Sequence, residues 1–188
     1  MQHYLLRQEI NVRKWFNFKN IKIFVDVGAY IGAYTLRAAK HGAKVYSFEP
    51  NPYSFNLLLL NVKDNGFEDR VILYNVALGD RDGEISLALN LDESHVSIEG
   101  YKVKMRTLDS FNIRNVDLLK IDVEGFEKEV LLGSEVTLGN TRSVIIEVSK
   151  DKKKFVEDLM IEHGLKKVRE ELTYPNASVY YLMFERRK

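Results

Sequence analysis

An apolar run that ends in a glycine-rich turn constrains the fold more than any other feature of the sequence. The segment 25–34 reads VDVGAYIGAY, follows Ile23 and Phe24, and precedes a stretch with helical spacing. Glycines at positions 28 and 32 let the backbone turn sharply and approach a ligand without a Cβ in the way. Asp26 adds a carboxylate at the end of the run. A strand that ends in such a loop predicts a ligand at the carboxyl edge of a parallel sheet.

The spacing of the glycines narrows the class of ligand. Gly28 and Gly32 form G-x-x-x-G, whereas dinucleotide-binding folds use G-x-G-x-x-G to seat a pyrophosphate on a helix N-terminus. Glu49 ends the next apolar run, where a carboxylate can accept hydrogen bonds from both hydroxyls of a ribose. A ribose site without a diphosphate cradle suits S-adenosylmethionine, and the loop, Asp26 and Glu49 would form it. The alternative is that the loop only joins a strand to a helix, as in any doubly wound protein.

Strand-like and helix-like segments alternate along the chain, which is typical of an α/β fold with a doubly wound parallel sheet. Apolar periodicity predicts strands at residues 21–27, 44–49, 70–76, 117–122 and 143–148. It predicts helices at residues 31–41, 52–65, 127–132 and 151–163. Two further strand-like runs lie between Leu165 and Arg186, on either side of the turn Tyr174-Pro175-Asn176. They predict an antiparallel C-terminal hairpin.

Several local features refine these elements. Asn51 with Pro52 is expected to start the second helix, and Asp151 is expected to cap the last. Leu57–Leu60, with Phe55 and Val62, are expected to pack in the core. Residues 1–20 carry apolar side chains at roughly helical spacing and are expected to cap the core.

The alternation is interrupted between residues 80 and 109. Glu84–Leu89 and Tyr101–Thr107 have the alternating character of short strands, and the polar segment Asn90–Gly100 joins them. This region predicts a hairpin inserted after the third strand. Its loop is expected to order over the carboxyl edge of the sheet, where lids and substrate loops are usually found.

The composition excludes several classes of protein. A chain of 188 residues with 45% hydrophobic content can bury one core, so we expect a single domain over residues 1–188. The 28 basic and 27 acidic residues nearly cancel, which disfavours an obligate nucleic-acid partner. The absence of cysteine excludes disulfides and thiolate chemistry. No signal-peptide core and no apolar run near the roughly 20 residues needed to span a bilayer are present, so we expect a cytoplasmic protein without a membrane partner.

Carboxylates emerge directly after the fourth predicted strand, in the sequence Asp122-Val123-Glu124-Gly125. A site for S-adenosylmethionine in an alternating strand–helix chain suggests a methyltransferase. Methyl transfer needs an aligned nucleophile and, when that nucleophile is a hydroxyl, a group that accepts its proton. Asp122 and Glu124 are therefore candidate catalytic residues, and His95 in the inserted loop is a third. The alternatives are that Glu124 caps the next helix, Asp122 orders the turn, and His95 is an exposed loop residue.

Two weaker signals concern charge. Glu147 ends the fifth predicted strand and could join Asp122 in a magnesium site, because oxygen ligands at adjacent strand ends suit a hard cation. A lone acid at a strand end is more often solvated, so no metal is predicted. Lys150 and Lys152–Lys154 form a basic run, and such a run is usually a solvated helix face.

Six blocks in order over about 120 residues resemble the FkbM-type S-adenosylmethionine-dependent methyltransferases. They are VDVGAYIGAYT, SFEPNPYSFNLLLLNV, VALGDRDG, TLDS, LLKIDVEGFEKEVLLG and VIIE. The resemblance implies a Rossmann-like, seven-stranded sheet and methylation of a hydroxyl on a small molecule or sugar. The residues expected to bind the cofactor are Asp26, Gly28, Tyr30, Gly32, Thr35, Glu49, Pro50, Val76 and Asp122. The family loop usually reads G-A-N-I-G, and this chain has Tyr30 at the Asn position.

Two alternatives stay open at this stage. The block Glu49-Pro50-Asn51-Pro52 and the lysine run also suit an RNA or tRNA methyltransferase, although the neutral charge disfavours it. Tyr30 suits a binding protein that kept the fold without catalysis, although intact Asp26, Glu49 and Asp122 disfavour that. An N-P-P-Y tetrapeptide is absent after the fourth strand, which argues against methylation of amino groups on bases.

Overall fold

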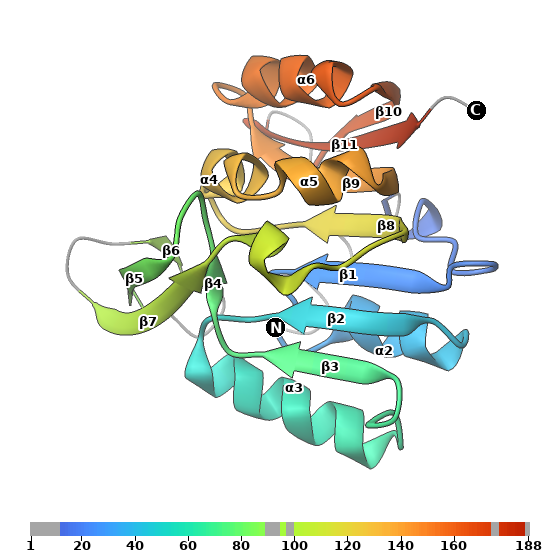
Figure 1. The fold of residues 1–188 in the computed structure, drawn as a ribbon, viewed down its shortest axis with the longest axis vertical. Helices are drawn as coiled ribbons and strands as arrows, with labels where there is room; N and C mark the ends of the chain where they lie inside the picture. Colours follow the sequence, from blue (N-terminus) through green and yellow to red (C-terminus); the bar gives the residue numbers. More distant parts are fainter. Residues whose placement is uncertain (1–11, 89–94, 97–99, 174–176, 187–188) are drawn as a thin grey trace.

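The computed structural model describes residues 12–88, 95–96, 100–173 and 177–186. Its centre is a seven-stranded sheet in which one strand, β11, runs antiparallel to the others (Figure 1). From edge to edge the strands are β10 (Leu165–Leu172), β11 (Val179–Arg186), β9 (Thr141–Ser149), β8 (Val116–Ile121), β1 (Ile23–Val27), β2 (Lys44–Phe48) and β3 (Val71–Tyr74). The expected fold class is confirmed, including the antiparallel C-terminal hairpin of β10 and β11.

Helices cover both faces of this sheet because alternate strand residues are apolar on each side. One face carries η1 (Val12–Lys14), α2 (Ala33–Lys40) and α3 (Pro52–Asp64), and the other carries α4 (Glu127–Leu132), α5 (Glu135–Gly139) and α6 (Lys153–Glu162). Phe24 and Leu118 are buried on the α2 side, whereas Val25 and Leu119 are buried on the α4–α6 side. None of the helices in the described part of the chain is long and apolar enough to cross a bilayer.

The order of strand addition reverses at the centre of the sheet. The chain builds β1, β2 and β3 toward one edge and then returns to place β8 on the other side of β1. Doubly wound sheets bind their ligands at such a switch point, beyond the carboxyl ends of the strands. Here that position lies after Val27 of β1 and Ile121 of β8, which are paired in register.

The insertion is a small sheet of its own rather than a lone hairpin. Its strands are β4 (Ala77–Leu78), β7 (Tyr101–Arg106), β5 (Gly83–Ala88) and β6 (His95–Val96), in that order. The expected hairpin is the antiparallel pair of β5 and β7, and the short 3-10 helix η2 (Leu108–Phe111) follows it. Figure 1 shows this sheet beyond the carboxyl ends of β1, β2 and β8. It is therefore placed beside the switch point.

Two local expectations were wrong, and one helix was missed. The third strand ends at Tyr74, before Asn75 and Val76, because the chain then leaves to pair β4 with β7. Asp151 does not cap α6; the cap position is Lys152, and the Asp151 carboxylate hydrogen-bonds to Ser149 instead. The helix α5 was not expected at all.

The leucine run in α3 is only partly core. Leu58 and Val62 are buried with Ser54, at the i, i+4, i+8 spacing of one helix face. Leu57, Leu59 and Leu60 are 52%, 48% and 53% exposed. A helix that covers an outer part of a sheet buries one stripe, so adjacent leucines cannot all be core residues.

Candidate active site

The glycine loop meets the end of β8 at close quarters. Gly28 has φ +76°, and a Cβ at this position would lie 1.7 Å from the carbonyl oxygen of Asp122. The backbone N–H groups of Gly28 and Ala29 both donate to the Phe48 carbonyl at 3.0 Å. A glycine is therefore required for steric reasons as well as for its dihedral angle. The loop, the end of β2 and Asp122 are held together at the switch point.

Glu49 links this loop to the start of α3. Its two carboxylate oxygens accept hydrogen bonds from the backbone N–H groups of Tyr30 and Asn51, each at 2.8 Å. The residue is 6% exposed, and burial raises the pKa of its carboxyl group to about 7. Each oxygen retains a second lone pair, so the geometry fits two ribose hydroxyls as donors.

Asn75 holds the same turn from the other side and was missed from the sequence. Its side-chain amide donates to the carbonyl of Glu49 at 2.8 Å and to that of Pro50 at 3.1 Å. Val76, the next residue, is half-buried against the core. The expected cofactor residues Glu49, Pro50 and Val76 thus lie along one edge of the switch point. The sequence signal for this residue was an asparagine near the end of the predicted strand 70–76, because asparagine is depleted in strands.

We expect cofactor binding to depend on the ionisation of Glu49. Ribose hydroxyls would donate to the charged carboxylate, so affinity should rise as the pH increases from 6 to 8 through the raised pKa of Glu49. Glu49→Gln should remove this part of the pH dependence and weaken binding at pH 8 by about 1.5–3 kcal/mol. Calorimetric titration of both proteins across this pH range measures the difference. An identical pH profile in a folded variant would remove Glu49 from the site.

Tyr30 occupies a backbone conformation that tyrosine rarely adopts. Its φ is +51°, in the left-handed region where Asn is several-fold enriched over other non-glycine residues. This explains why an Asn suits the position. The interaction that the loop makes with Glu49 comes from the Tyr30 backbone N–H, which any residue except proline supplies. The departure from the family pattern therefore leaves this contact intact.

Tyr30→Asn should stabilise the protein without cofactor by about 0.5–1 kcal/mol, because Asn tolerates the left-handed region better than an aromatic residue. For a chain of this size the melting temperature should rise by about 1–4 °C. Tyr30→Phe is the matched control, since it keeps the aromatic ring and the unfavourable conformation. A lower melting temperature for the Asn variant than for the Phe variant would contradict the explanation.

A buried polar network lies beneath the loop. Asp26 and Thr35 have no exposed surface, and Thr35 Oγ1 donates to Asp26 Oδ2 at 2.7 Å. Thr35 Oγ1 also lies 2.7 Å from the hydroxyl of Ser47. These contacts tie the first turn of α2 to β1 and β2. The structure thus places Asp26 and Thr35 under the loop, where they position its backbone.

Lys120 completes the network and was also missed from the sequence. It is 5% exposed and stands opposite Asp26 in the register of β1 and β8. Its ammonium group lies 3.3 Å from Asp26 Oδ1 and 3.4 Å from Asp122 Oδ2, and it donates to the Gly28 carbonyl at 2.8 Å. A lysine inside the apolar strand Leu118–Ile121 is costly unless paired. That cost was the signal that an acidic partner faces it.

Three carboxylates meet near the carboxyl ends of β8 and β9. One oxygen from each of Asp122, Glu124 and Glu147 lies within 4.8 Å of the others. Burial and then the charge of Asp122 raise the pKa of Glu147 to about 8, whereas its hydrogen bond with Tyr181 acts in the opposite direction. Carboxylates this close do not all ionise readily. The cluster can therefore take up a proton, and its oxygen donors would also suit a hard cation.

The turn that carries Glu124 has a strained backbone, and side chains from α4 and from the start of α6 hold it in place. Glu124 has φ +48°, and such outliers in bulky residues cluster at active sites. It does not cap α4, whose cap position is Phe126. Glu127 accepts the Gly125 backbone N–H at 2.6 Å, and Lys152 hydrogen-bonds to the Gly125 carbonyl. The turn is thus fixed between α4 and the start of α6.

The comparisons with known proteins agree with this geometry. A family model described as the methyltransferase FkbM domain matches residues 26–174. The chain belongs to the FkbM methyltransferase family. The family match spans the glycine loop, the insertion, the acidic cluster and all of β10. The LLKIDVEGFEKEVLLG block of this FkbM chain forms β8, the strained turn and α4.

Similarity to individual FkbM and related proteins is moderate. Hexuronic acid methyltransferase AglP of Haloferax volcanii is 32% identical over 133 residues, covering 65% of this chain and 54% of that protein. The 2-O-methyltransferase NoeI of Sinorhizobium fredii is 26% identical over 156 residues, covering 68% and 63%. The crystal structure of methyltransferase FkbM from Methylobacillus flagellatus has a TM-score of 0.67 at 18% identity, covering 94% of this chain and 47% of that one. The chain therefore spans less than two thirds of the length of each.

The roles of the remaining candidates of this FkbM chain stay predictions. His95 belongs to β6 and pairs through its backbone with Ala88 of β5. Most of the segment Asn90–Gly100 lies outside the described residues, and its closure over the site also stays a prediction. Gly32 lies at the cap of α2 with φ +97°.

Proposed function

We propose that the chain is an S-adenosylmethionine-dependent O-methyltransferase that acts on a hydroxyl of a small molecule or sugar. One observation carries the proposal: the glycine loop with Glu49 and the acidic cluster at Asp122 converge on the switch point, with the Gly28 backbone against Asp122. The printed names of AglP and NoeI, a hexuronic acid methyltransferase and a 2-O-methyltransferase, support oxygen as the acceptor.

We assign cofactor binding and proton acceptance to different residues according to their positions. S-adenosylmethionine supplies a methyl carbon on a positively charged sulfur. Glu49 and the glycine loop would hold the ribose and amino-acid parts, while Lys120 and Asp26 keep the loop against β8. The bound cofactor would supply this methyl group to the acceptor oxygen and leave as the neutral thioether. A carboxylate of the acidic cluster, with Asp122 nearest the loop, accepts the proton that the hydroxyl releases.

The lysine run does not support the RNA alternative. Lys152 lies 3.4 Å from Glu127, and Lys153 and Lys154 form ion pairs with Glu170 and Asp158. Lysines engaged in this way contribute little to a phosphate-binding surface. Tyr30 was the feature that suited a non-catalytic binding protein. It no longer favours that alternative, because the Tyr30 backbone N–H makes the hydrogen bond with Glu49.

Methyl transfer from labelled S-adenosylmethionine tests the proposal. The panel of acceptors should contain sugars and phenols as hydroxyl acceptors, primary amines as nitrogen acceptors, and transfer RNA. We expect label on hydroxyl acceptors and saturable binding of the cofactor by calorimetry. Label on transfer RNA or amines alone would replace the proposed acceptor, and absence of cofactor binding would refute the function altogether.

A further inference from the structure

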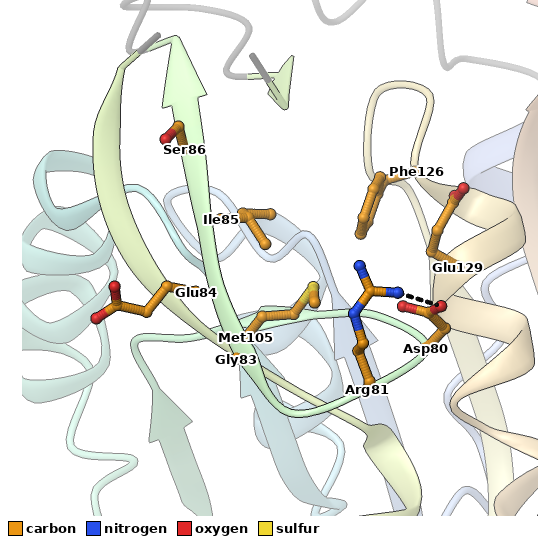
Figure 2. Close-up of a pocket in the computed structure, with 9 residues that line it drawn as sticks. All are labelled: Asp80, Arg81, Gly83, Glu84, Ile85, Ser86, Met105, Phe126 and Glu129. Carbon is orange, nitrogen blue, oxygen red and sulfur yellow. Dashed lines mark hydrogen bonds and ion pairs between the residues drawn. The ribbon is translucent and has the colours of Figure 1, made fainter. Parts of the chain in front are cut away.

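A pocket of about 460 Å³ opens between the insertion and the start of α4. This volume lies within the range of roughly 300–1,000 Å³ that is typical of small-molecule sites. Figure 2 shows Ile85 and Met105 on one side and the Phe126 ring on the other. Glu84 also borders the pocket, but its side chain points to the opposite side of β5 (Figure 2). The lining therefore combines apolar and polar groups and includes one aromatic ring.

The polar residues that line the pocket carry three carboxylates, one guanidinium and one hydroxyl: Asp80, Glu84, Glu129, Arg81 and Ser86. Arg81 lies 3.1 Å from Asp80, so its charge is already paired. Glu129 stands beside Phe126 on α4 (Figure 2). Its Oε2 is shielded from solvent and accepts no hydrogen bond from any residue in the described part of the chain. With Asp80 and Arg81 paired, the carboxylates of Glu84 and Glu129 leave the pocket with a net negative charge.

The pocket adjoins the chain segment that carries two residues of the acidic cluster. Phe126 follows Asp122 and Glu124 by four and two residues, and its backbone N–H donates to the Val123 carbonyl at 3.3 Å. Gly79 packs against both Met105 and Phe126, because a Cβ there would lie 2.5 Å and 3.2 Å from their side chains. The insertion is thus docked directly on the segment that carries the candidate base.

We propose that this pocket binds the acceptor and selects an uncharged polyhydroxylated ring over one that carries a carboxylate. The proposal rests on the proposed O-methylation and names its substrate class. The ring of Phe126 would contact the apolar C–H face of a sugar, and a sugar hydroxyl would donate to the carboxylate of Glu129. A uronate would place a second negative charge beside Glu129, and Arg81 would have to leave Asp80 to neutralise it.

Methyl-labelled methionine provides a direct measure of occupancy. The chain has four methionines; Met105 lines the pocket, whereas Met160 is fully buried in α6 and serves as an internal control. The probes are methyl glycosides of glucose, galactose, mannose and rhamnose, together with methyl glucuronoside and methyl galacturonoside, added with S-adenosylhomocysteine present. We expect the Met105 signal to shift saturably with neutral sugars and at least about tenfold more weakly with the uronates.

Two variants and one control sharpen the test. Phe126→Leu should weaken binding of the neutral sugars about tenfold, and Glu129→Gln should raise the uronate-to-neutral affinity ratio about tenfold. Glu68→Gln should change neither, because Glu68 is exposed between α3 and β3 and does not line the pocket. Cofactor affinity should stay at the parent value in all three proteins, which shows that they are folded.

The outcomes separate this proposal from the proposed function. Unmoved Met105 signals with every sugar, or tighter binding of the uronates, would overturn the pocket proposal. Methyl transfer to a sugar with a parental KM in both Phe126→Leu and Glu129→Gln would also overturn it and leave the function standing. Binding at Met105 without transfer to any sugar would overturn the acceptor role of the pocket. Absence of transfer to sugars, phenols and every other hydroxyl acceptor would refute the proposed function.

Discussion

Asp122→Asn is expected to lower turnover by about 100-fold or more while the protein folds normally, if Asp122 accepts the proton of the acceptor hydroxyl. The amide keeps the shape of the side chain and loses its charge and basicity. Glu147 gives a second signature, because the Asp122 charge contributes to its raised pKa. Removal of that charge should lower the pKa of Glu147, so the acidic limb of the residual activity should move to lower pH.

Turnover measured from pH 6 to 9, with and without chelator, separates the roles of Asp122. A proton acceptor predicts the loss in both conditions. A cation ligand predicts instead that the parent enzyme needs magnesium and that the variant has lost this dependence. Glu147→Gln is the matched control at the neighbouring strand end. It removes the carboxylate whose pKa the Asp122 charge raises, and it leaves Asp122 in place. Near-parental turnover of Asp122→Asn in both conditions would return Asp122 to an ordering role and direct attention to Glu124 or His95.

Gly28→Ala should destabilise the protein by about 3 kcal/mol or more and abolish cofactor binding. The Cβ would stand 1.7 Å from the Asp122 carbonyl oxygen, so β1 and β8 would have to separate at their carboxyl ends. The left-handed backbone costs an alanine about 1–2 kcal/mol, and overpacking typically adds about 1–3 kcal/mol. Urea unfolding followed through Trp15, the one tryptophan of the chain, measures the loss.

Gly42→Ala isolates the conformational part of this cost. Gly42 has φ +89°, and a Cβ there would meet no atom within 4 Å. Its substitution should cost only about 1–2 kcal/mol. Equal losses in the two variants would show that the contact between Gly28 and Asp122 relaxes freely, and would weaken the claim that it fixes the site.

Local sequence patterns determined most of the fold. Strand and helix periodicity depends on residues a few positions apart, so β1, β2, β8 and α4 were placed within one or two residues of their observed ends. The glycine loop, Glu49 and Asp122 were found for a related reason: each directly follows an apolar strand. In a parallel sheet all such positions emerge at one edge.

Contacts between distant segments were decided only by the tertiary structure. Lys120 binds Asp26 and the Gly28 carbonyl across more than 90 positions of sequence, a pairing that follows from the β1–β8 register. The same register buried Asp26 under the loop. The exposure of Leu57 and Leu60 depended on how much of α3 the sheet covers. The pocket at Phe126 and Glu129 exists because the insertion folds onto α4. The order of the strands and the packing of the insertion on α4 depend on the whole chain. They cannot be predicted from short segments of the sequence.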